Sequence, residues 1–105
     1  MRRTESLWRE HGGVMRTAID LATTIGELDR LWTDTAEVFI DAIRTILENM
    51  GVPPGHGVDE SSSIARTLCW MIERNLYQAS RASDAELSRA SQTCAEIWRR
   101  AAKSD

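Results

Sequence analysis

The chain has 105 residues, of which 42% are hydrophobic and 28% charged, and its net charge is −3. These values indicate one soluble, globular domain over residues 1–105 and exclude a disordered chain. The basic residues are scattered and form no concentrated stripe, so we expect no appreciable DNA binding by this chain alone.

The sequence lacks an apolar run long enough for a transmembrane helix and lacks a signal-peptide pattern, so we expect a cytoplasmic protein without a membrane partner. Cys69 and Cys94 have no metal-type spacing. They suit a reduced cytoplasmic protein in which each thiol packs in the interior.

Apolar side chains recur at three- and four-residue spacing, and alternation with a period of two is rare. We therefore predict an all-α fold, a helical bundle of about four to five helices. A short leading segment over 4–10 is expected to end at the glycine pair at positions 12 and 13. A helix then follows over 14–22, with its apolar side chains on one face.

The clearest helix comes next. Thr24 and Glu27 have the spacing of a capping box, and apolar residues recur from there to Met50. An α-helix rises about 1.5 Å per residue, so about 26 residues give a helix of roughly 39 Å. Gly51 is a plausible C-cap, and the two prolines that follow prevent continuation. The Pro/Gly-rich loop over 51–60 is expected to be mobile.

Two further helices are expected, over 61–79 and, after a second capping box formed by Ser83 and Glu86, over 84–102. The segment 68–77 is apolar around nearly its whole circumference, although it carries an adjacent acid and base. Such a helix is buried on more than one side. We therefore expect it to lie between the interior of the domain and a second chain.

Motifs of catalysis are absent from the sequence, including those of zinc proteases, P-loop enzymes and serine hydrolases. His11 and His56 lie far apart in the sequence, each next to glycine, and neither has the neighbours that a metal site needs. An enzyme is therefore the least expected class of protein, and we predict no cofactor and no metal.

Several sequence features, in this order, resemble the C-terminal domain of TetR-family transcriptional repressors, and within that family its EthR-like (ethionamide-resistance-repressor-like) branch. They are HGGVMRTAIDLATTIGELDRLW at 11–32, the long helix after it, MIERNLY at 71–77 and EIW at 96–98. TetR repressors begin with a helix-turn-helix domain that does not precede position 11 here. We therefore expect either an excised regulatory domain or a natural protein that has lost its DNA reader.

The resemblance implies an apolar tunnel beside the long helix that binds a small hydrophobic effector. In EthR-like proteins an asparagine pair stands at positions 69 and 72, so its replacement here makes the tunnel more apolar. Glu73 or the indole of Trp98 would then hold the ligand. The alternative is that the aromatic residues simply fill a core. The expected tunnel residues are Trp32, Ala36, Phe39, Ile43, Cys69, Ile72, Glu73, Leu76 and Trp98.

Trp70, Arg74 and Tyr77 recur on one helical face, which Arg66 extends, and such residues are enriched at the centres of interfaces. In TetR proteins the last two helices pair with those of a second copy. We therefore expect a homodimer through 62–80 and 84–102, acting as an effector-binding regulatory domain. Two alternatives remain, namely a self-contained bundle and a purely structural dimerisation module without a small-molecule ligand.

Overall fold

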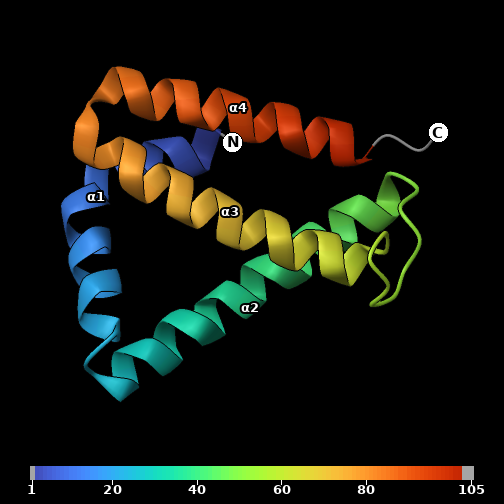
Figure 1. Ribbon diagram of the computed structural model, residues 1–105, viewed down its shortest axis with the longest axis horizontal. Helices are drawn as coiled ribbons and strands as arrows, with labels where there is room; N and C mark the ends of the chain where they lie inside the picture. The colour runs from blue at the N-terminus through green and yellow to red at the C-terminus, as the bar shows by residue number, and fades with distance from the viewer. Residues whose placement is uncertain (1, 103–105) are drawn as a thin grey trace.

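A computed structural model describes residues 2–102, so positions 1 and 103–105 of the expected domain lie outside the described residues. Over that range the chain forms four α-helices and no strand, which confirms the predicted all-α bundle. The helices are α1 (Arg2–Ala22), α2 (Gly26–Asn49), α3 (Ser61–Ala82) and α4 (Asp84–Ala102). α3 runs back between α2 and α4, and α1 descends from α4 to the start of α2 (Figure 1).

The glycine pair does not end a helix, as we had expected, but lies within α1 just after a kink at His11 (φ −123°, ψ 15°). Gly12 is buried, and a Cβ at that position would lie 2.9 Å from the Arg16 guanidinium and 3.6 Å from Ser80 of α3. The Arg16 side chain also donates a 2.8 Å hydrogen bond to the Ser80 hydroxyl. The glycine therefore marks a close contact between α1 and α3.

The predicted signal for the start of α2 is not used, whereas the predicted signal for its end is. The predicted capping box at its start does not form, because the Thr24 hydroxyl donates to the Leu21 carbonyl and no side chain caps the helix. The C-terminus is as expected, with Gly51 in the left-handed region at φ +100°. The Gly51 and Val52 amides donate to the carbonyls of Glu48 and Leu47. This glycine C-cap provides hydrogen-bond donors for the free carbonyl groups of the last helical turn.

The loop over 51–60 makes several hydrogen bonds within itself and to the flanking helices, and its expected mobility stays a prediction. The Ser61 amide donates to the Pro53 carbonyl at 2.8 Å, and the Gly57 amide donates to the Glu60 carboxylate at 2.7 Å. The Ser61 hydroxyl also donates to the Glu48 carboxylate at 2.5 Å, which ties the start of α3 to the end of α2.

The interior consists of two apolar clusters arranged along α3, which contributes to both. One cluster joins α3 to α2 around Leu47, and the other joins α3 to α4 and α1 around Leu76. Trp98 of α4 packs against both clusters. The described part of the chain is only 18 Å thick in its shortest dimension, so its interior is divided between these two clusters rather than forming one deep core.

Candidate functional site

An apolar cavity of about 340 Å³ lies among all four helices. This size falls within the range of small-molecule sites. All four tryptophans of the chain and its single phenylalanine line the cavity. The lining residues are Arg3, Thr4, Leu7, Trp8 and Met15 from α1, Trp32, Thr35, Ala36, Phe39, Ala42, Ile43 and Ile46 from α2, Cys69, Trp70, Ile72 and Glu73 from α3, and Trp98 from α4.

The structure brings together eight of the nine expected tunnel residues around this one cavity. The exception is Leu76, which is fully buried in the core cluster between α3 and α4. Leu76 lies one turn beyond Ile72 on α3, past the end of the cavity. Its role is packing, and its assignment to the tunnel is corrected.

The wall between α2 and α3 is closely packed. Ala36 is 7% exposed, and the Cys69 thiol lies 3.9 Å from the Ala36 carbonyl oxygen as a weak donor. Burial raises the pKa of the Cys69 thiol, and the nearby carboxylates of Glu73 and Glu37 raise it further. The thiol is therefore held in its neutral form, which keeps this wall apolar.

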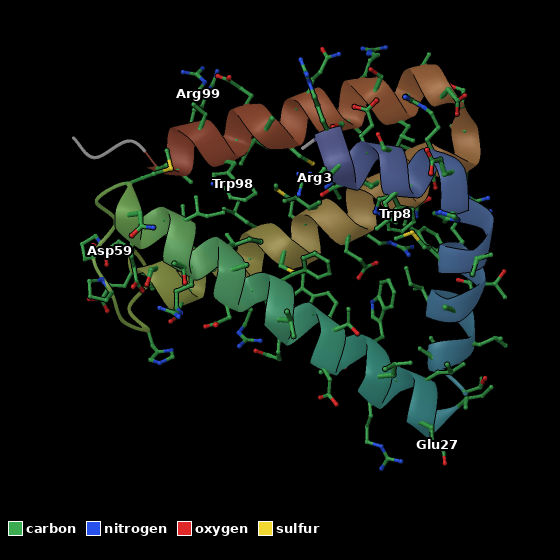
Figure 2. The ribbon with its side chains drawn as sticks, turned by 180° about the vertical axis from the view of Figure 1, so that it is seen from behind. Arg3, Trp8, Glu27, Asp59, Trp98 and Arg99 are labelled. Atoms are coloured by element: carbon green, nitrogen blue, oxygen red, sulfur yellow. The ribbon has the colours of Figure 1, made fainter. Side chains whose placement is uncertain are left out.

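One edge of the cavity is open to solvent. Leu7 of α1 and Phe39 and Ile46 of α2 line it, and they are 43%, 54% and 44% exposed. Trp8 and Trp98 close the other sides, with Trp98 extending from α4 into the space between α4 and α2 (Figure 2). A hydrophobic ligand could therefore reach the aromatic walls from the side of α1 and α2.

Glu73 and Arg3 are the charged side chains among the described residues that line the cavity. Glu73 is partly buried, and desolvation raises the pKa of its carboxyl group. The side chain of Trp32 and the positive charge of Arg74 act in the opposite direction. Arg3 by contrast is exposed, near the start of α1.

Residues of α1 and further residues of α2 also line the cavity, although they were not predicted to do so. Thr35, Ala42 and Ile46 continue the spacing of Trp32 and Phe39 along one face of α2, so helical periodicity alone could have identified them. No such signal places Trp8 or Met15, because their contribution depends on how α1 folds back over α2 and α3.

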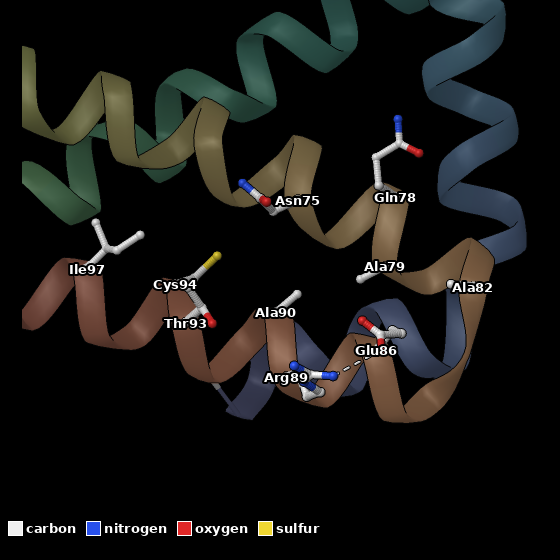
Figure 3. Close-up of a pocket in the computed structure, with 10 residues that line it drawn as sticks. All are labelled: Asn75, Gln78, Ala79, Ala82, Glu86, Arg89, Ala90, Thr93, Cys94 and Ile97. Atoms are coloured by element: carbon white, nitrogen blue, oxygen red, sulfur yellow. Dashed lines mark hydrogen bonds and ion pairs between the residues drawn. The ribbon is translucent and has the colours of Figure 1, made fainter.

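A second hollow, of about 450 Å³, runs along the outer side of α3 and α4 (Figure 3). We call it the α3–α4 groove. Several of its lining residues are alanines, which allow another helix to approach closely, and Ile97 is 41% exposed within it. It is lined by Asn75, Gln78, Ala79, Ala82, Glu86, Arg89, Ala90, Thr93, Cys94 and Ile97.

None of the four side chains expected at the dimer interface lines this groove. Trp70 instead lines the cavity, and Tyr77 is 5% exposed and packs against Trp8 of α1. Arg66 pairs with Glu37 of α2, and the exposed Arg74 lies 4.8 Å over the Tyr77 ring. The burial of Tyr77 against Trp8 of α1 corrects the expectation that Tyr77 faces a second chain, whereas Trp70 is only partly buried, so its place at a dimer interface stays a prediction.

Within residues 2–102, no three His, Cys, Asp or Glu side chains come together as a metal site would require. Both cysteines are free thiols, Cys94 buried and Cys69 partly buried. In the part of the chain that the structure describes, no helix is both long enough and apolar enough to cross a membrane.

Comparison with family models, with curated proteins and with solved structures gave no match to this chain. The resemblance to TetR-family repressors therefore rests on the sequence segments quoted above, and the site must be interpreted from its own geometry.

Proposed function

We propose that this chain is the effector-binding and dimerising domain of a TetR-family transcriptional repressor that acts in the cytoplasm. The observation that supports this most strongly is the convergence of residues chosen from the sequence on a single aromatic cavity. If the tryptophans merely filled a core, their rings would pack against each other without leaving about 340 Å³ between them.

The proposed ligand is a small hydrophobic molecule that enters beside Phe39 and lies along α2. Ligand binding would favour one of two arrangements of the dimer and so report to a DNA-binding domain joined to it. The ligand can act only through a difference in its affinity for the two arrangements.

A change that fills the cavity tests this proposal. We expect Ala36→Phe to abolish the rise in melting temperature that saturating decanol produces in the wild-type chain. A ligand at 100 times its dissociation constant stabilises the folded chain by about 2.7 kcal/mol. Thr45→Phe is the matched control, because Thr45 is exposed on the opposite face of α2. An equal shift in wild type and Ala36→Phe would contradict the assignment.

The α3–α4 groove supports the second part of the proposal, a homodimer through α3 and α4. Its alanines and the exposed Ile97 would meet the same surface of a second copy around a two-fold axis. This observation alone also fits the alternative function, a structural dimerisation module without a ligand. The ligand experiment separates the two functions.

Light scattering after size-exclusion chromatography tests the interface. We expect Ile97→Glu to convert a dimer into a monomer, because the carboxylate would be buried without a partner. Val38→Glu is the matched control, since Val38 is an exposed apolar residue of α2, 70% exposed and outside the groove. A wild-type monomer, or an Ile97→Glu variant that remains dimeric, would contradict this interface.

A further inference from the structure

Glu73 differs from several other glutamates of the described chain, because it lines the apolar cavity and forms no ion pair. Glu37, Glu48 and Glu96 each form an ion pair with an arginine. Hydrogen bonds lower the pKa of each carboxyl group, from the Ser61 hydroxyl and then Arg44 at Glu48 and from the paired arginines at Glu37 and Glu96. None of the ion pairs within residues 2–102 includes Glu73. A partly buried carboxylate without a cation is costly, and a ligand that carries the cation would remove this cost.

The neighbours of Glu73 supply only part of that charge, because Arg74 lowers the pKa of the Glu73 carboxyl group from a distance without forming an ion pair with it. Arg74, next in sequence, places its guanidinium over the Tyr77 ring. Cys69 lies one turn earlier on α3, α2 contributes Trp32, and α4 contributes the uncharged Trp98. The remaining charged residue that lines the cavity is Arg3 of α1, which is absent from the charges that shift the Glu73 pKa.

The walls around this carboxylate favour the same ligand chemistry. The rings of Trp32, Trp70 and Trp98 come from three helices and line the cavity together with Glu73. Indole is the side chain that attracts cations most strongly through its ring face, and the attraction grows when water is excluded. An apolar cavity that combines several indoles with one carboxylate is suited to a molecule with a hydrophobic body and a positively charged head group.

We propose that the cavity takes a lipophilic cation, an alkyl or aryl body bearing a protonated amine or a quaternary ammonium, whose charged head lies against Glu73. This inference rests on the proposed effector-binding function and specifies the class of effector. The aliphatic body would lie along Phe39 and Ile43 of α2, with the head toward α3.

Calorimetric titration with three probes of equal chain length tests the charge preference. The probes are decyltrimethylammonium, decanol and decanoate, each below its critical micelle concentration. We expect the wild-type chain to bind the ammonium at least about tenfold more tightly than the alcohol. In Glu73→Gln the two affinities should fall within about twofold of each other, because the charge that favours the ammonium is gone.

Glu27→Gln is the matched control, because Glu27 is exposed at the start of α2 and outside the cavity; it should keep the wild-type preference. Equal wild-type affinities for ammonium and alcohol, or a preference that survives in Glu73→Gln, would overturn the inference. Tighter binding of decanoate would assign the head group to Arg3 and would also overturn it. If none of the probes binds, the effector-binding function itself fails.

Discussion

The Tyr77 hydroxyl donates a 2.5 Å hydrogen bond to the Asp20 carboxylate, which joins the C-terminal part of α3 to the end of α1. The Tyr77 ring also contacts Trp8 edge-on, with the ring centroids 6.4 Å apart. These contacts hold α1 across α3 next to the cavity. The position of Trp8 in the cavity wall therefore depends on a polar contact outside it.

We expect this bond to be visible in the titration of the phenol. The hydrogen bond to Asp20, followed by burial, raises the pKa of Tyr77. A raised folded-state pKa stabilises the fold below the unfolded value of about 10, and this stabilisation is lost as the pH rises through the folded pKa. Tyr77 is the single tyrosine of the chain, so ultraviolet absorbance of tyrosinate reports it directly.

Asp20→Asn should lower the pKa of Tyr77, because it removes the negative charge beside the phenol. Asp29→Asn is the control, since Asp29 lies exposed at the start of α2 and does not contribute to the Tyr77 shift. Superimposable absorbance titrations of wild type and Asp20→Asn would show that this contact is absent in solution.

Leu76→Ala and Phe39→Ala should separate packing from ligand binding. Leu76 is fully buried, and its truncation should lower the free energy of unfolding by about 2–5 kcal/mol. Phe39 is 54% exposed at the cavity edge, so its truncation should cost less than about 1 kcal/mol. Phe39→Ala should instead weaken decanol binding by about tenfold. Urea denaturation and calorimetry measure the two effects, and a reversed order would contradict the described cavity.

Ser83 and Thr24 give a matched test of helix capping. The Ser83 hydroxyl accepts a 3.1 Å hydrogen bond from the Glu86 amide at the start of α4. Ser83→Ala should therefore destabilise the chain by about 0.5–2 kcal/mol. Thr24→Ala removes no cap of α2 and should have a much smaller effect in the same urea denaturation. Equal losses would show that the Thr24 capping box forms after all.

Gly12 and Gly13 should respond differently to alanine. A Cβ at Gly13 meets nothing within 4 Å, so Gly13→Ala should stabilise the chain by about 0.5–1 kcal/mol. At Gly12 the same change displaces the Arg16 side chain from Ser80, which offsets this gain. Thermal unfolding compares the two variants, and equal stabilisation would contradict the close approach of α1 to α3.

Local sequence signals predicted the helices well, because each signal acts within a few residues. Apolar periodicity indicated α2, α3 and α4, Gly51 ended α2 as expected, and Ser83 caps α4. Thr24 does not cap α2, because its hydroxyl donates a hydrogen bond to the Leu21 carbonyl at the end of α1 instead.

The faces of α3 could be predicted only in part. Successive residues are about 100° apart around a helix, so a strongly apolar helix does not reveal which face meets which neighbour. Ile72 and Glu73 were placed in the cavity correctly, whereas Trp70 and Tyr77 were assigned outward. The burial of Tyr77 depends on α1, whose path across α3 is held by long-range contacts of its Asp20 with Tyr77 and of its Arg16 with Ser80.

Quenching of tryptophan fluorescence by a brominated decanol tests the central claim most directly, because all four tryptophans line the cavity and bromine quenches indoles at contact. We expect saturable quenching of the folded wild-type chain that is lost in Ala36→Phe and retained in Thr45→Phe. Linear, non-saturating quenching like that of the urea-unfolded chain would contradict a ligand-binding cavity.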